Sequence, residues 1–192
     1  MLLAWMKPMA LGQAKSATPA NDNTVDQKQT TRIAMGSVSG TPGLSVVVPL
    51  YINPAEGVQV GSLELVVDFI SANLKFNRLD PGMAAEIGKV QVSAEVKQGK
   101  NDRGVDTATL KITAAMPSSP EPETGIPSGL LAYLTFRVDD DARSASITLR
   151  TTAKANELNT NNPIESLRVV ESSVDILEGS SPPSVVCFIY SH

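Results

Sequence analysis

Apolar side chains recur at every second position through the middle of this chain, and this period of two constrains the fold more than any other feature. In residues 62–70 the apolar positions are Leu63, Leu65, Val67 and Phe69, and the positions between them are Ser62, Glu64, Val66 and Asp68. Successive side chains of a β-strand point to opposite faces of a sheet. The pattern therefore predicts a strand with one buried and one exposed face.

The same period returns in several other short segments. They are residues 45–52, 74–76, 89–97, 108–114 and 130–138, with shorter traces at 147–149 and 174–176. Turn residues separate them, among them Asp80-Pro81-Gly82 and the polar loop 99–104. About nine short strands of this kind predict an all-β fold, an antiparallel β-sandwich with one solvent-facing side per sheet. The only predicted helical turn is residues 81–87.

Pro49 lies inside one of these segments, between Val48 and Leu50. Proline cannot donate a hydrogen bond to a neighbouring strand, so it is found at sheet edges or at bulges. We therefore expect the strand 45–52 to be an edge strand or to carry a bulge.

The two ends of the chain differ from its middle. Residues 1–14 are mostly apolar and end in small residues, which fits either the end of a signal peptide or a disordered N-terminus, and we favour the first. Residues 15–31 are polar and predict a flexible linker, and residues 179–192 form a Ser/Pro linker followed by a short apolar tail. No apolar run reaches the roughly 20 residues that cross a bilayer, so stable membrane insertion is not expected. These features predict a secreted protein, extracellular or on the cell surface, with a folded domain over residues 32–178.

The composition excludes several functions. A net charge of −4 gives no basic surface for a nucleic acid. The single histidine, His192, and the single cysteine, Cys187, both lie in the C-terminal tail, so neither a catalytic triad nor a zinc site is expected in the domain. Glu64 and Asp68 share a strand face but lie about 13 Å apart, beyond the roughly 9.5 Å limit of glycosidase carboxylate pairs. We expect no enzyme and no cofactor, although cross-strand carboxylate pairs stay open.

Three further features have a functional and a plain structural interpretation. Asp139, Asp140 and Asp141 suggest calcium, but they lack the alternating ligand spacing of a calcium loop, so a solvated turn is favoured and no metal site is predicted. The amide-rich loop 156–162 more often satisfies its own backbone than a ligand. Tyr51 and Tyr133 are the domain aromatics expected to point outward, and two tyrosines on separate strands make a poor sugar platform.

Five sequence strings, in their order and spacing, resemble the cohesin domain, the bacterial module that binds dockerins in cellulosome-type assemblies. They are SVSGTPGLSVVVPLYI (37–52), VGSLELVVDFISANLKFNRLDPG (60–82), GLLAYLTFRV (129–138), ANELN (155–159) and SSVDIL (172–177). The resemblance implies a jelly-roll β-sandwich over residues 32–178. It also implies a flat sheet face that recognises a protein partner, dockerin-like and in that family calcium-loaded.

The sequence departs from the family at positions that face the partner. Many members carry Tyr-Asp-Pro where this chain has Phe69-Ile70-Ser71, and the usual Asn and Asp contacts correspond to Ser62 and Glu64. A later acidic contact falls at Met116. The resemblance thus implies a partner-binding set of Ser62, Glu64, Val66, Asp68 and Met116, with a partner that need not be the family's usual one.

The leading hypothesis from the sequence is a non-catalytic protein-recognition module resembling cohesin. The alternatives are a structural module of a larger cell-surface or matrix protein and, third, a carbohydrate-binding module. Glu64 and its neighbours on the same strand face mix polar groups with an apolar centre, as modest protein interfaces do. An ordinary solvated sheet face has the same composition.

Overall fold

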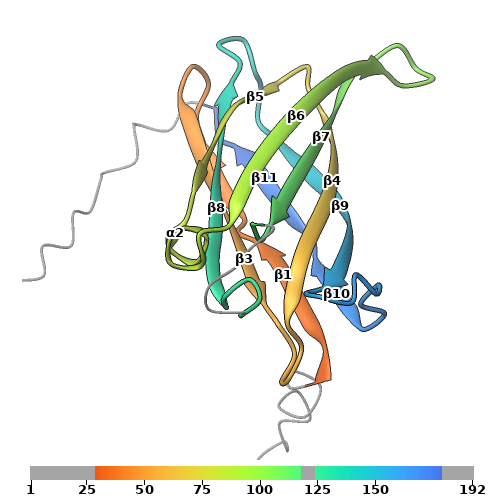
Figure 1. The fold of residues 1–192 in the computed structure, drawn as a ribbon. Helices are drawn as coiled ribbons and strands as arrows, with labels where there is room; N and C mark the ends of the chain where they lie inside the picture. The colour runs from red at the N-terminus through yellow and green to blue at the C-terminus, as the bar shows by residue number, and fades with distance from the viewer. Residues whose placement is uncertain (1–28, 118–123, 179–192) are drawn as a thin grey trace, which may run out of the picture.

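The computed structural model describes residues 29–117 and 124–178, which form a two-layered β-sandwich (Figure 1). Its elements are β1 (Thr31–Met35), β2 (Val38–Gly40), β3 (Ser45–Asn53), β4 (Val60–Ile70), β5 (Leu74–Pro81), α2 (Met83–Gly88), β6 (Gln91–Lys100), β7 (Asp106–Ala115), β8 (Gly129–Val138), β9 (Ala145–Glu157), β10 (Leu167–Val170) and β11 (Ser172–Ile176). The predicted all-β sandwich is confirmed. The predicted signal peptide, the N-terminal linker up to residue 28 and the tail 179–192 lie outside the described residues.

The two layers are a five-stranded sheet in the order β10-β1-β3-β8-β5 and a six-stranded sheet in the order β2-β11-β9-β4-β7-β6. Strand pairs are antiparallel except β1 with β10 and β2 with β11, which are parallel. Each of the first two strands thus pairs with one of the last two. The sheets are therefore mixed, a detail that the alternation of side chains does not reveal, because it is the same in both kinds of pairing.

The inner faces of the two sheets form one hydrophobic core. Phe136 on β8 is completely buried and packs edge-on against Phe69 on β4 and Phe76 on β5, with ring centroids 5.4 and 5.7 Å away. Such edge-to-face geometry suits the charge distribution of aromatic rings. The predicted inward residues of β3 and β4 are buried: Val46, Val48, Leu50, Ile52, Leu63, Leu65, Val67 and Phe69.

Pro49 lies in the interior of the five-stranded sheet and not at its edge, because β3 is paired on both sides, with β1 and β8. The expected bulge is present: the β3–β8 register shifts between Leu50 and Tyr51. β1 ends at Met35, opposite Leu50, and Gly36 follows opposite Pro49. The Gly36 carbonyl oxygen accepts a hydrogen bond from the Ser172 hydroxyl at 2.8 Å, so it does not need the donor that proline lacks. The Pro49 carbonyl oxygen accepts a hydrogen bond from the Gly36 backbone N–H at 2.8 Å.

Several boundaries differ from those expected. β9 spans Ala145–Glu157, far beyond the predicted 147–149, because small or polar residues line much of its length. Asp80 and Pro81 close β5, and the chain turns through α2, which starts at Met83 and ends where Lys89 adopts a left-handed conformation (φ 52°). The strands β1, β2 and β10 were not predicted, because each has five residues or fewer and so shows little alternation.

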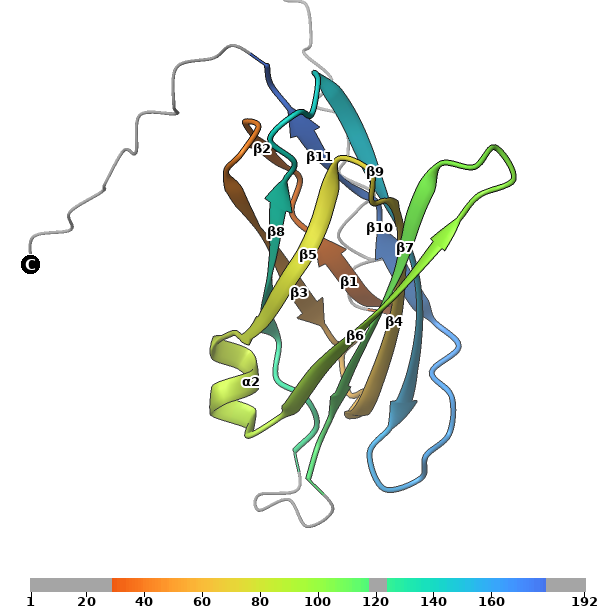
Figure 2. The ribbon, with the colours of Figure 1, turned by 90° about the horizontal axis from the view of Figure 1, so that it is seen from above.

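Val96 was expected on the core face of its strand, together with Val90, Val92 and Ala94, and this expectation is wrong. Val96 is 43% exposed, because the β6–β7 hairpin extends beyond the opposite sheet (Figure 2). Val90, directly before β6, is 7% exposed. The alternation of β6 is thus maintained past the end of the core.

Candidate partner-binding face

The outer face of the six-stranded sheet is built around β4. Burial alternates along this strand, so that Leu63, Leu65 and Val67 are at most 2% exposed. Their neighbours Ser62, Glu64, Val66 and Asp68 point to the outer face, as predicted, and are half-buried or exposed. The structure therefore brings these four sequence-predicted residues onto one surface.

The register of β4 with β7 and β9 places each of these residues between two cross-strand neighbours. Val66 lies opposite Lys111 and Thr152. The corresponding neighbours are Thr113 and Lys154 for Glu64, Thr109 and Arg150 for Asp68, and Ala115 and Asn156 for Ser62. The sequence reasoning missed these flanking residues. Their outward direction could have been derived from alternation, but their register could not.

Glu64 forms an ion pair with Lys111 of β7, with 2.8 Å between Oε2 and Nζ. The hydrogen bond from this ammonium holds the pKa of Glu64 below its ordinary value of 4.5, and the positive charges of Lys111 and Lys154 act in the same direction against partial desolvation. The same pair raises the pKa of Lys111. Glu64 is therefore a carboxylate at neutral pH, ready to accept further hydrogen bonds on a surface where two ammonium groups surround it.

Asp68 lies at the edge of a hollow of about 420 Å³ on this face. Its carboxylate accepts a hydrogen bond from the Thr109 hydroxyl. The pairing of β4 with β9 ends at Asp68 and Arg150, and beyond this point the floor of the hollow includes Phe69, Ala108 and Ile147. The hollow thus combines an apolar floor with a polar rim, to which Arg150 on β9 belongs.

Met116, the fifth predicted residue, follows β7 directly. Its backbone N–H donates a hydrogen bond to the Gly61 carbonyl oxygen at 2.9 Å, which places it beside the start of β4. Its side chain is partly buried and packs against the core. Met116 is therefore next to Ser62 at one end of the face, with its side chain mostly engaged inward.

The acidic turn after β8 is held by its own ion pairs. Lys75 Nζ lies 2.6 Å from Asp139, and Arg137 lies 3.0 Å from Asp140. The Lys75 hydrogen bond, assisted by the backbone N–H of Asp141, lowers the pKa of Asp139. No group of three or more metal-ligating side chains occurs in residues 29–117 and 124–178. These contacts support the interpretation of this segment as a turn.

The amide-rich loop after β9 is also engaged with itself. The backbone N–H of Glu157 donates to the Asn162 carbonyl oxygen at 2.8 Å, and the Thr160 hydroxyl donates to the Glu157 carboxylate at 2.9 Å. Asn159 and Asn161 adopt left-handed conformations, with φ of 67° and 54°, which asparagine tolerates better than most residues. These bonds support the expectation that the loop satisfies its own backbone.

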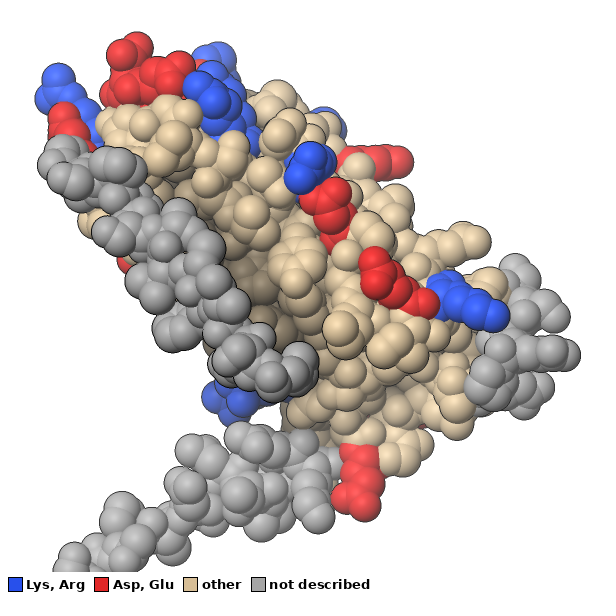
Figure 3. Space-filling view, turned by 90° about the vertical axis from the view of Figure 1, so that its left-hand side faces the viewer, with Lys and Arg blue, Asp and Glu red and all other residues tan. Residues whose placement is uncertain are grey.

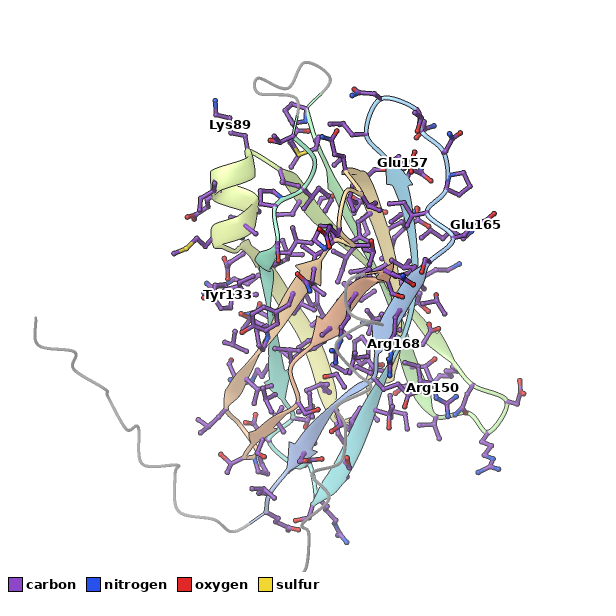
Figure 4. All side chains as sticks on the ribbon, turned by 90° about the horizontal axis from the view of Figure 1, so that it is seen from below. Lys89, Tyr133, Arg150, Glu157, Glu165 and Arg168 are labelled. Carbon is purple, nitrogen blue, oxygen red and sulfur yellow. The ribbon has the colours of Figure 1, made fainter. Side chains whose placement is uncertain are left out.

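The outer face of the five-stranded sheet is different in character. Tyr51 and Tyr133 point outward, as predicted, and are 44% and 39% exposed. Tyr133 and Arg150 project from opposite sides of the molecule (Figure 4). Charged side chains are sparse in the centre of the five-stranded side, in the part that Figure 3 shows. Tyr133 lies opposite Pro49, diagonal to Tyr51, and no ring contact joins the two tyrosines in the described part of the chain.

The outer face of the six-stranded sheet thus carries hydroxyl, ammonium and carboxylate groups around Val66. A family model described as the cohesin domain matches residues 31–176 of this chain. The chain belongs to the cohesin family, whose members are non-catalytic protein-binding modules. Among curated proteins, none matches this chain.

Solved structures share the fold at low sequence identity. The sixth cohesin of Acetivibrio cellulolyticus scaffoldin B, solved with a Cel5 dockerin, has a TM-score of 0.57 and 17% identity, covering 78% of this chain and 100% of that one. The OlpA cohesin of Clostridium thermocellum, in a type I complex with dockerin 918, gives 0.58 and 19%, covering 78% and 100%. A non-cellulosomal cohesin of the hyperthermophilic archaeon Archaeoglobus fulgidus gives 0.53 and 19%, covering 77% and 91%.

Within the described residues, no helix has both the length and the apolar character needed to span a membrane.

Proposed function

We propose that this domain acts outside the cell and binds a dockerin-like protein partner through the outer face of β9, β4, β7 and β6. The observation that carries the proposal is the surface around Val66. This half-buried apolar residue lies on the central strand β4, with the Glu64–Lys111 ion pair beside it. Membership of the cohesin family and the dockerin complexes of its structural relatives support the same class of partner.

The chemistry of this face suits a partner of mixed polarity. Hydroxyl groups of Ser93 and Thr113, which share a hydrogen bond of 2.7 Å, offer both donors and acceptors. Ammonium and guanidinium groups alternate with carboxylates along neighbouring strands; they are Lys111, Lys154 and Arg150 against Glu64, Glu95 and Asp68. Paired charges cost less to desolvate than single ones, so a protein surface with matching donors and acceptors fits here better than a highly charged polymer.

The proposed contact set contains Ser62, Glu64, Val66 and Asp68, with Met116 at the end of the face. We expect Glu64 and Val66 to contribute most, since they lie nearest its centre, where interface energy concentrates. The side chain of Met116 is partly buried, so only a small part of it can contact a partner. We therefore expect Met116 to shape the rim of the interface.

The experiment is titration calorimetry with dockerin modules captured from the native secretome by the wild-type domain. Glu64→Lys should weaken binding at least about tenfold, because it replaces the acceptor of a central charged hydrogen bond by a repelling cation. The matched control is Glu86→Lys, an exposed position on α2 with the same charge change. Equal affinity of both variants, or capture of polysaccharide in place of protein, would contradict the proposal.

Calcium provides a second test. We propose that the metal belongs to the partner, so a chelator should abolish complex formation and leave the melting temperature of the isolated domain unchanged. A chelator that lowers that melting temperature would place the metal in this domain instead.

A further inference from the structure

The strand β6 forms one edge of the six-stranded sheet, and the second half of the strand is exposed to solvent. Residues 95–100 are all exposed, including Val96, whose side chain is on the face that elsewhere covers the core. Figure 2 shows that this part of the β6–β7 hairpin extends away from the rest of the sandwich. Open edges of this length present unpaired backbone donors and acceptors to another strand.

The hairpin turn determines which backbone groups face outward. The Asn101 N–H donates to the Val105 carbonyl oxygen at 3.0 Å, so the backbone groups of residue 101 point toward β7. The β6–β7 register continues without a bulge. Because these groups alternate along an antiparallel strand, residues 99, 97, 95, 93 and 91 also point to β7, whereas Val92, Ala94, Val96, Gln98 and Lys100 direct their N–H and C=O groups to the free edge.

A second copy of the same strand matches this edge in one register. If two antiparallel β6 strands meet with Val96 opposite Val96, the outward-pointing groups of both strands pair in register, and each Glu95 stands opposite Lys97 of the other copy. These are non-hydrogen-bonded positions, where opposite residues approach most closely. A pairing centred on Ala94 sets Glu95 against Ser93, and one centred on Gln98 sets Lys97 against Gly99. Only the Val96-centred register, among these three, brings opposite charges together.

Glu95 lies opposite Lys111 of its own chain and interacts with it only through charge, and both Glu95 and Lys97 are exposed. Neither Glu95 nor Lys97 forms a salt bridge within residues 29–117 and 124–178. Lysine on an edge strand commonly prevents such pairing. Here Glu95, two residues before Lys97, provides each lysine with an opposite charge from the other copy, and the two exposed Val96 side chains cover each other.

We propose that two copies of this domain associate by antiparallel pairing of their β6 strands about Val96, joining the two six-stranded sheets into one. The two-fold axis is then perpendicular to the sheet, so both outer faces lie on the same side. The pair would present two copies of the outer face side by side. Glu95 and Lys97 also lie on the outer face, but the inference concerns the backbone edge of β6 and does not depend on what that face binds.

The test is sedimentation equilibrium of the described domain from about 1 µM to about 1 mM, the range in which a modest interface dimerises. The wild-type domain should be in monomer–dimer equilibrium. Glu95→Lys or Lys97→Glu alone should raise the dimer dissociation constant about tenfold, since each change turns two attractions into two repulsions. The double variant should restore it to within about threefold, because it restores opposite charges. Arg143→Glu, an exposed charge change away from β6, should have no effect.

Val96→Pro tests the backbone directly. It removes an N–H that points to the free edge, which an edge strand tolerates, and it should abolish the dimer while leaving the monomer folded by circular dichroism. A wild-type domain that stays monomeric at every concentration would overturn the proposal. So would a dimer that withstands both Glu95→Lys and Lys97→Glu.

Discussion

Lys111 on β7 lies diagonally across from Glu64 on β4, with 2.8 Å between its Nζ and the carboxylate Oε2. The pair sits beside Val66 in the middle of the outer face of the six-stranded sheet. Both side chains remain partly exposed, 48% and 40%, so the pair contributes little to stability and much to the pattern of charge that a partner meets.

Removing Lys111 should return the pKa of Glu64 toward its ordinary value. In the wild-type domain the hydrogen bond from Lys111 lowers this pKa, so Lys111→Met should raise it, as measured by NMR titration of the Glu64 side-chain carboxyl carbon. Lys75→Met is the matched control, since it should raise the pKa of Asp139 and leave Glu64 unchanged. A Glu64 titration that Lys111→Met does not move would refute the pairing.

The same shift sets the sign of a small pH effect on stability. A carboxyl group with a lowered pKa in the folded state stabilises the fold above its ordinary pKa of 4.5, and this contribution is lost as the pH falls through the lowered value. Between pH 7 and pH 3, the wild-type domain should therefore lose more stability than Lys111→Met. Urea denaturation at both pH values measures the difference.

Adjacent residues of β4 should respond very differently to truncation. Leu65 is completely buried, so Leu65→Ala should lower the free energy of unfolding by about 2–5 kcal/mol. Val66, its neighbour on the outer face, should cost less than about 1 kcal/mol when changed to alanine. Urea denaturation of both variants measures this contrast, and similar losses would mean that the faces of β4 are assigned wrongly.

Thr31 anchors the start of β1 through a buried hydrogen bond. Its side chain is fully buried, and its hydroxyl oxygen accepts a hydrogen bond from the Ala55 backbone N–H at 3.0 Å. Thr31→Val should cost about 1–3 kcal/mol, because the buried N–H loses its acceptor while the shape is kept. Thr31→Ser retains the acceptor and should cost less in the same thermal unfolding measurement. The reverse order would show that the hydroxyl is unimportant.

Gly61, beside the bulge at the start of β4, is required for space. A Cβ there would lie 2.7 Å from the Leu158 Cα, and this backbone atom could move away only by distorting the chain around it. Gly61→Ala should therefore destabilise the domain by about 1–3 kcal/mol. In Gly99→Ala the nearest atom would be the Thr107 Oγ1 at 3.6 Å, so this variant should be nearly neutral. Differential scanning calorimetry compares them, and equal melting temperatures would contradict the close approach.

The features of the fold that depend on local periodicity, such as which side chains of a strand point outward, could be predicted from the sequence. Burial on β4 follows the period of two, so the outward direction of Ser62, Glu64, Val66 and Asp68 could be derived before any pairing was known. Lys111 could not be connected with Glu64 in this way, because the two residues are 47 positions apart along the chain and only the register between β4 and β7 brings them together. The same limit applies to Arg150 and Thr109 around Asp68.

Other differences arise from where the sheets end. Val96 continues the alternation of β6, yet no opposite sheet covers it, and alternation alone does not report the extent of the core. Pro49 was expected at an edge or a bulge because it lacks a donor. The bulge is present, and an internal position is possible because the Ser172 hydroxyl satisfies the Gly36 carbonyl oxygen opposite Pro49. The residues of a strand thus indicate its own length, but they do not indicate how far the neighbouring strands extend.

We propose that the outer face of β9, β4, β7 and β6 is the partner-binding surface. NMR cross-saturation from an unlabelled dockerin partner to the labelled domain tests it most directly, since it reports which amides lie at the interface. We expect the strongest saturation at Glu64, Val66 and Lys111, and none at Tyr51 and Tyr133 on the five-stranded sheet. Saturation centred on the two tyrosines, with β4 unaffected, would contradict it.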